Sequence, residues 1–124
     1  MTAEQRHIGL FLLSYVPQVV AGDKYNVGLL ALERRDERRH FLGARFIPDT
    51  KGLLAFDPNA DVDVLLALFR EIEQRLRERE DAGAFLHAML DSFSNNIQIS
   101  DEKIVVISGD PEDEIDRLAA IYGL

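Results

Sequence analysis

Residues 25–47, YNVGLLALERRDERRHFLGARFI, decide the fold. Two runs in this stretch, Tyr25–Glu33 and Arg38–Ile47, are rich in aliphatic and aromatic residues and alternate in the manner of β-strands. A short charged segment joins them. Because this segment is too short for a parallel crossover, the two runs are expected to form an antiparallel hairpin.

The register of this hairpin follows from placing Arg35-Asp36 at its tip. Gly28 then faces Gly43 and Asn26 faces Arg45 on one side of the sheet. The other side is more continuously apolar and is the expected core face, although a slip of one residue would exchange the two faces. Its expected members are Tyr25, Val27, Leu29, Ala31, His40, Leu42, Ala44 and Phe46.

The segments around the hairpin extend it into one α+β domain over residues 1–124. Ile8–Val16 is predicted to be a further strand, ended by Pro17, which gives an N-terminal three-stranded antiparallel meander. The stretch Asp49–Asn59 is expected to be a connector. Two helices, short C-terminal strands and a closing helix are expected to follow.

The helices are predicted from apolar residues at helical spacing. A stripe from Val62 to Leu76 has Asp61 as its N-cap, and a second stripe runs from Ala82 to Phe93, with a break near Asp81. Ser94-Asn95-Asn96 is expected to end this second helix. The next elements are short strands at Ile97–Ile99 and Ile104–Ile107, then a helix with Asp110 as N-cap, Pro111 in its first position and Ile115, Leu118, Ala119 and Tyr122 on its apolar face.

Composition limits the classes of function. The chain has 124 residues with 14 Lys and Arg against 22 Asp and Glu, a net charge of −8, which disfavours binding to nucleic acid through phosphate contacts. Without cysteine it has no disulfide or Cys-ligated metal site, which fits a reducing cytoplasm. No apolar stretch approaches the ~20 residues needed to cross a bilayer, so no membrane association is expected.

The charge is unevenly distributed along the chain. Residues 1–52 carry eight basic and six acidic groups, whereas residues 53–124 carry six basic and sixteen acidic groups. Arg34, Arg35, Arg38 and Arg39 are mixed with three carboxylates, which is typical of a solubilising hairpin tip; docking of an acidic partner is the alternative.

Motifs for cofactor or metal chemistry are missing from the sequence. The three histidines lie on different expected elements, and residues 57–61 begin like a calcium loop but lack its Gly and its closing Glu. There is no GxSxG, Walker or GxGxxG motif. We therefore expect no cofactor and no metal, and no assembled catalytic group can be named.

The most specific site hypothesis is a notch in the sheet where Gly28 and Gly43 meet. Two facing glycines would leave space for a ligand or another backbone, and Asn26 and Arg45 at the rim could orient a carboxylate or phosphate. The alternative is that a helix packs into the notch while Asn26 bonds a neighbouring loop.

A resemblance to a known family rests on Ser14-Tyr15-Val16-Pro17, followed by Tyr25-Asn26-Val27-Gly28 and two leucines, and on Asp116-Arg117-Leu118 in the closing helix. In these residues the chain resembles the bacterial domain-of-unknown-function family DUF3037. The family supplies no established activity. Some members look to be encoded beside kinases similar to the toxin kinase HipA, so the resemblance implies a partner role, and it identifies no catalytic residue.

Three hypotheses of function follow. The first is a small cytoplasmic interaction or accessory subunit with a protein partner, such as a HipA-like kinase. The second is a small enzyme, a hydrolase or nucleic-acid-processing protein, that uses Tyr15, Asn26, His40 or Arg45 on the sheet. The third is an acidic mimic of nucleic acid, which would need its carboxylates in a regular exposed row.

Overall fold

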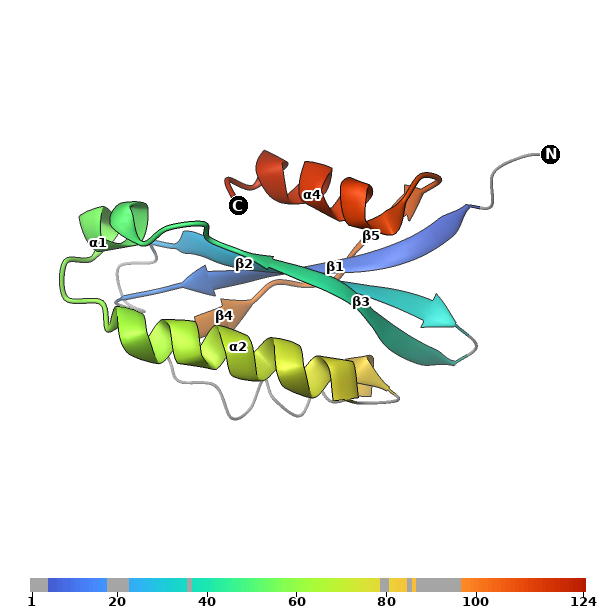
Figure 1. The fold of residues 1–124 in the computed structure, drawn as a ribbon, viewed down its shortest axis with the longest axis horizontal. Helices are drawn as coiled ribbons and strands as arrows, with labels where there is room; N and C mark the ends of the chain where they lie inside the picture. Colours follow the sequence, from blue (N-terminus) through green and yellow to red (C-terminus); the bar gives the residue numbers. More distant parts are fainter. Residues whose placement is uncertain (1–4, 18–22, 36, 79–80, 85, 87–96) are drawn as a thin grey trace.

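The computed structural model describes residues 5–17, 23–35, 37–78, 81–84, 86 and 97–124. These residues form an α+β fold in which helices lie on both faces of one antiparallel sheet (Figure 1). The elements are β1 (Arg6–Tyr15), β2 (Tyr25–Arg35), β3 (Arg38–Phe46), α1 (Lys51–Phe56), α2 (Val62–Glu78), β4 (Ile97–Ile99), β5 (Lys103–Ile107) and α4 (Pro111–Ile121).

The sheet contains the predicted three-stranded meander. β1 pairs antiparallel with β2, and β2 pairs antiparallel with β3. The two late strands complete the same sheet on the other side of β1. β4 pairs with Leu13–Tyr15 and β5 pairs with Arg6–Leu10, so the strands are ordered β3-β2-β1 followed by β4 and β5 along one edge.

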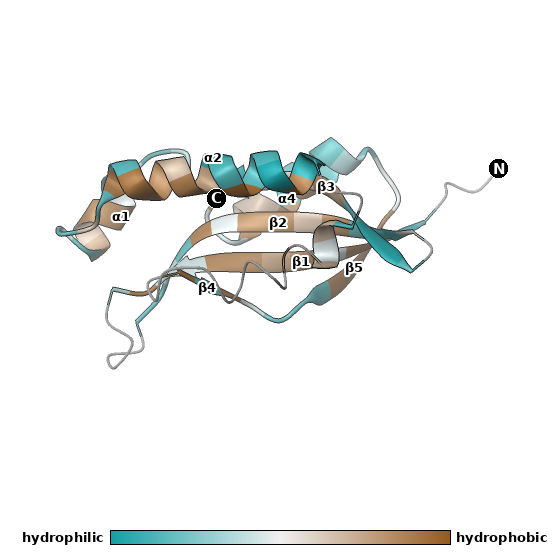
Figure 2. Cartoon of the chain, turned by 90° about the horizontal axis from the view of Figure 1, so that it is seen from below, coloured by the Kyte–Doolittle hydropathy of each residue, from teal (hydrophilic) through white to brown (hydrophobic). Residues whose placement is uncertain are grey.

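Both faces of the sheet are covered, which the sequence analysis did not predict. One cluster of buried residues packs α2 onto the sheet and a second packs α4 onto the opposite face (Figures 1 and 2). Val27 and Leu30 of β2 belong to the α2 side, whereas Leu29 and Ala31 belong to the α4 side, and all four are fully buried. The prediction of one core face, with Val27, Leu29 and Ala31 together, was therefore wrong.

A β-bulge accounts for part of this difference. Leu13 lies opposite Gly28 and Ser14 lies opposite Asn26, so Val27 is an extra residue of β2. A bulge shifts the alternation of side chains by one position. Residues on its two sides therefore cannot be assigned to one face by counting in steps of two.

The two long helices begin where their caps predict. Asp61 Oδ1 accepts a hydrogen bond from the Val64 amide at 3.2 Å, which confirms Asp61 as the N-cap of α2. Asp110 occupies the N-cap position of α4 with Pro111 after it. The predicted apolar faces are buried: Leu65, Phe69, Ile72 and Leu76 in α2, and Ile115, Leu118 and Ala119 in α4.

The segment between β3 and α2 is more regular than predicted. The expected connector Asp49–Asn59 contains α1, whose Leu53 is buried in the α2-side core. The predicted break at Asp81 is present, because Asp81 lies outside a helix and its Oδ1 accepts the Ala84 amide at 3.2 Å. Residues 82–84 and 86 are helical; the rest of the predicted Ala82–Phe93 helix, and its expected end at residues 94–96, lie outside the described residues.

Candidate functional site

The predicted notch between two facing glycines does not form. Gly28 lies opposite Phe46, and Gly43 lies opposite Ala31. A Cβ on Gly28 would point to the α2 side and a Cβ on Gly43 to the α4 side. The predicted pairing of Gly28 with Gly43 was therefore wrong, and the two positions open no common space.

Two features of the hairpin move the register. Arg35 pairs with Arg38, so the strands close one residue later than the predicted Arg35-Asp36 tip. A second shift lies between Ala31 and Leu32, where Leu42 of β3 is left without a partner. The one local signal for this bulge is Gly43 beside Leu42, because a glycine inside a strand often accompanies a bulge.

Each glycine admits a neighbouring side chain instead of a ligand. A Cβ on Gly28 would lie 2.8 Å from the ring of Phe46, which stacks on Phe69 with 4.7 Å between ring centroids. A Cβ on Gly43 would lie 3.0 Å from Cδ1 of Ile115 in α4. Both positions therefore serve close packing, and the packing of a helix against Gly43 agrees with that part of the alternative hypothesis.

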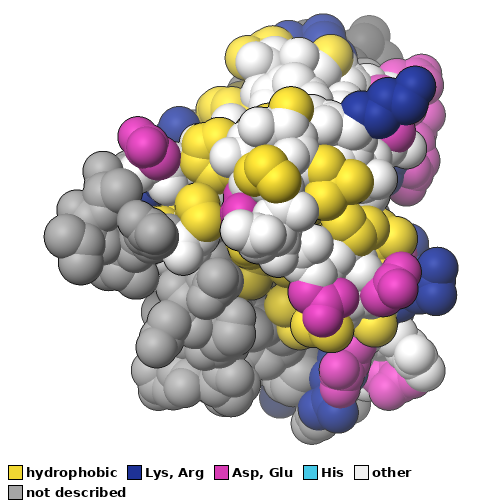
Figure 3. All heavy atoms as spheres, turned by 90° about the vertical axis from the view of Figure 1, so that its left-hand side faces the viewer, with side chains coloured by type: hydrophobic (Ala, Val, Ile, Leu, Met, Phe, Trp, Pro, Cys, Tyr) yellow, Lys and Arg dark blue, Asp and Glu magenta, His cyan; other side chains and the backbone are white. Residues whose placement is uncertain are grey.

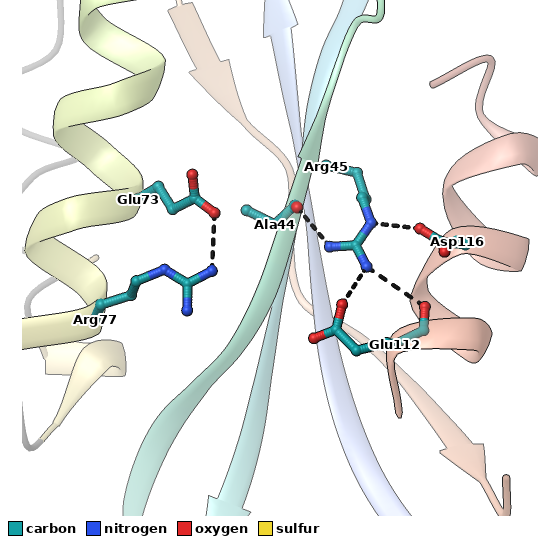
Figure 4. A network of polar contacts seen from close by, with 6 residues as sticks. All are labelled: Ala44, Arg45, Glu73, Arg77, Glu112 and Asp116. Carbon is teal, nitrogen blue, oxygen red and sulfur yellow. Dashed lines mark hydrogen bonds and ion pairs between the residues drawn. The ribbon is translucent and has the colours of Figure 1, made fainter. Parts of the chain in front are cut away.

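Arg45 joins β3 to α4 (Figure 4). Its Nε donates to Asp116 Oδ1 at 2.5 Å and its Nη2 donates to Glu112 Oε2 at 2.6 Å, while Nη1 donates to the carbonyl of Ala44 at 2.8 Å. Burial lowers the pKa of Arg45, but the two carboxylates outweigh this effect and raise the pKa above its usual value. Arg45 is thus charged and held by the helix. Its partner across the sheet in β2 is Leu29, so the predicted pairing with Asn26 was wrong.

Asn26 lies at the start of β2 beside a hollow on the α4 side. Its Oδ1 accepts a hydrogen bond from the buried Ser14 hydroxyl at 3.3 Å, whereas the alternative hypothesis expected a bond to a loop. The hollow has a volume of about 280 Å³ and is open to solvent. Its lining residues are Lys24, Tyr25, Asn26, Tyr122 and Gly123.

Tyr15 lies on the other face of the sheet. It is buried in the α2-side core, and its hydroxyl donates to Asp57 Oδ2 at 2.7 Å. This bond joins β1 to the segment between α1 and α2. Tyr15 and Asn26 therefore lie on opposite sides of the sheet. The structure does not bring the predicted site residues into one site: Tyr15, Asn26, Gly28, Gly43 and Arg45.

The enzyme hypothesis also named His40, which lies opposite Glu33 near the end of β2. Asn26 is seven residues away along that strand, about 20 Å at the usual rise of a β-strand. Within the described residues, no group of three or more His, Asp or Glu side chains gathers in a way that could hold a metal ion.

The arginines near the hairpin tip have acidic neighbours. Arg39 forms an ion pair with Glu102 at 2.7 Å, and its amide donates to Asp81 at 3.4 Å. A hollow of about 290 Å³ lies beside it. Its lining mixes both signs of charge, with Arg34, Glu37, Arg39, Asp81, Gly83 and Ala84.

A surface that the sequence analysis missed lies at the end of the molecule formed by α1 and the start of α2. Leu54 is 39% exposed and Val64 is 60% exposed. Hydrophobic side chains gather on this end in Figure 3, with carboxylates at their border. We call it the α1-end surface and define it by Leu54, Ala55, Phe56, Val62 and Val64, which are exposed or half-buried.

The charge around this surface is negative. Residues 48–64 contain four Asp and one Lys. Asp49 and Asp61 each accept one backbone amide, from Lys51 and Val64. Within the described part of the chain, neither they nor Asp63 form an ion pair. The α1-end surface thus combines exposed aliphatic groups with carboxylates that lack a countercharge there.

The comparisons with known proteins identify a family and no activity. In the described part of the chain, no helix is both long and apolar enough to span a membrane. Neither a curated protein nor a solved structure matches the chain. The model of the family described as protein of unknown function (DUF3037) matches residues 11–122, nearly the whole sequence. The chain therefore belongs to the DUF3037 family.

Proposed function

We propose that this protein is an interaction or accessory subunit that docks a basic, apolar segment of a partner protein on the α1-end surface. The proposal rests on the exposure of Leu54 in α1 and Val64 in α2, together with Asp49, Asp61 and Asp63 of the same end, which form no ion pair in the described part of the chain. Exposed apolar groups rimmed by charge are typical of sites where proteins bind one another.

The sign of the charge selects the kind of partner. Carboxylates attract Lys and Arg side chains, and they oppose nucleic-acid phosphates, anionic lipid headgroups and a second copy of the same surface. A partner segment with aliphatic residues for Leu54 and Val64 and with basic residues for the aspartates fits both properties. An amphipathic basic helix has this composition.

The resemblance to DUF3037 proteins implies a candidate for the partner. It points to a kinase similar to the toxin kinase HipA, and we propose that such a kinase carries the basic segment. The hypothesis of an acidic nucleic-acid mimic has less support, because α2 pairs Glu71 with Arg75 and Glu73 with Arg77 instead of presenting an unpaired row.

The test uses two matched variants and a purified HipA-like kinase from the same host. Val64→Lys places a cation on the α1-end surface, where it repels a basic partner. Ile121→Lys makes a similar change on α4, where Ile121 is 66% exposed. We expect the dissociation constant for Val64→Lys to rise at least about tenfold over wild type, with Ile121→Lys unchanged.

Two results would contradict the proposal. Equal binding by wild type and both variants would remove the α1-end surface as the docking site. If the kinase does not bind, affinity purification from the host with the same variants gives a second measurement. A protein that co-purifies in stoichiometric amount with wild type and Ile121→Lys, but not with Val64→Lys, would identify another partner for the same surface. If no such protein is recovered, the proposed function is wrong.

A further inference from the structure

The outer edge of the sheet at β5 is open among the described residues. β5 pairs with β1 on one side, and no described strand pairs with it on the other. It forms the lower border of the sheet in Figure 2. Ile104 and Val106 are 62% and 51% exposed, and neither belongs to a core cluster of the described residues.

The two edges of the sheet are protected to different degrees. β3, at the opposite edge, carries Arg38, Arg39 and Arg45, contains a bulge at Leu42, and contacts both α2 and α4. Charges, bulges and covering helices are the devices that keep an edge strand from pairing with another chain. β5 has the sequence KIVVI, with one charged residue and no proline, and no shift interrupts its pairing with β1.

We propose that two copies of this chain form a dimer by antiparallel pairing of β5 with β5 about a two-fold axis at Val105. Such pairing joins the two sheets edge to edge, and it is the isologous arrangement that a symmetric dimer requires. It rests on a different part of the molecule from the α1-end surface, so it goes beyond the proposed function and is tested separately.

The sequence of β5 is complementary to itself in this register. Ile104 lies opposite Val106 of the second copy, so the exposed aliphatic side chains form two cross-strand pairs on one face. Lys103 lies opposite Ile107, and Glu102 lies opposite Ser108. No like charges are opposed, whereas a register centred on Lys103 would place two lysines together.

Contact with the core holds β5 ready for pairing. Ile107 is buried in the α4-side cluster and Val105 packs against that cluster. These residues hold β5 in place as a strand in the single chain, because their side chains bury against α4. The second copy therefore meets an ordered edge, which reduces the entropy lost on pairing.

The test compares three variants by sedimentation over a range of protein concentrations. Ile104→Lys introduces two cations beside the two-fold axis, and Ile121→Lys changes the same residue type at similar exposure on α4. The double variant Ile104→Lys/Val106→Glu places each lysine opposite a glutamate of the second copy. Circular dichroism verifies that each variant is folded.

We expect wild type and Ile121→Lys to reach twice the mass of one chain, with a common dissociation constant. Ile104→Lys is expected to raise that constant at least about tenfold, and the double variant to restore most of the dimer. If wild type stays monomeric at every concentration, the proposal is wrong, and the edge of β5 would be available for a strand of another protein. A dimer that Ile104→Lys leaves intact, or that the double variant fails to restore, would also overturn it.

Discussion

The guanidinium of Arg45 and the carboxylate of Asp116 lie 2.5 Å apart, although 71 residues separate them in the chain. This contact, with Glu112 beside it, positions α4 over β3. Figure 4 shows that Arg45 points toward α4 and away from α2. The residue that the sequence analysis assigned to a ligand therefore has a structural partner within the chain.

Replacement of Arg45 is expected to lower stability. Arg45→Ala removes four side-chain hydrogen bonds, and we expect a loss of about 1 kcal/mol in the free energy of unfolding, because the carboxylates are largely exposed. Arg117→Ala, which removes an exposed pair within α4, serves as the control and should cost less. Urea unfolding of both variants measures the difference. If Arg45→Ala is as stable as Arg117→Ala, the link to α4 contributes no more than the exposed Arg117–Glu114 pair.

The two glycines of the rejected notch should respond differently to alanine. In Gly28→Ala the new Cβ meets the Phe46 ring, which the stacked Phe69 holds in place, so we expect a loss of about 2 kcal/mol. In Gly43→Ala the nearest atom is the end of the flexible Ile115 side chain, and we expect a loss below about 1 kcal/mol. Thermal unfolding distinguishes them, and equal losses would contradict the expected difference between the Phe46 ring and the Ile115 side chain as neighbours.

Elements with a local cause could be predicted from the sequence. The spacing of Leu65, Phe69 and Ile72 predicts α2, and Asp61 marks its start, because amphipathic helices and their caps depend on neighbouring residues. The meander follows from short connections between alternating runs. The helix α1 was missed because six residues are held by the burial of Leu53 and by no side-chain cap.

Features that depend on distant packing could not be predicted. The partner of Arg45 depends on where α4 lies, and nothing near Arg45 in the sequence specifies that position. The α1-end surface has one local signal, since Val64 is an apolar residue away from the buried face of α2. The sequence does not show that residues of α1 lie at the same end of the molecule, so the patch as a whole could not be predicted.

The hydrogen bond from Tyr15 to Asp57 should stabilise the segment between α1 and α2. Tyr15→Phe removes the hydroxyl donor from a buried position, and we expect a loss of about 1 to 2 kcal/mol. Tyr25→Phe is the control, since no hydrogen bond to the Tyr25 hydroxyl is found among the described residues. Hydrogen exchange should rise at residues 57–61 in Tyr15→Phe alone. Unchanged exchange there would show that the bond does not order the segment.

The acid side of the stability profile should depend on Asp81. The Ala84 amide, followed by further amides and Arg38, lowers the pKa of Asp81 below its ordinary value of 3.8. A carboxyl with a lowered pKa contributes stability above its unfolded pKa and loses it as pH falls through the folded pKa. Asp81→Asn keeps a capping oxygen but has no charge to lose. Its stability, measured by urea unfolding, should fall less than that of wild type between neutral pH and pH values below 3.8, and parallel curves would contradict this role.

Added salt should affect the two proposed interactions in different ways, because partner binding at the α1-end surface depends on charge whereas dimer formation at β5 depends on aliphatic contacts. Binding of a basic partner to the α1-end surface relies on unpaired carboxylates, so added salt screens the attraction and raises the dissociation constant. Asp63→Asn removes one of these charges and leaves the hydrogen bond of the Asp61 cap in place, so it should reduce the salt dependence of partner binding.

Pairing of β5 joins aliphatic residues between two chains of net charge −8. Added salt therefore screens a repulsion and should leave the dimer as strong or stronger. Isothermal titration for the partner and sedimentation for the dimer, over one salt series, measure both slopes. If added salt changes both dissociation constants in the same direction, either partner binding is not driven by the carboxylates or the dimer is not held by its aliphatic residues.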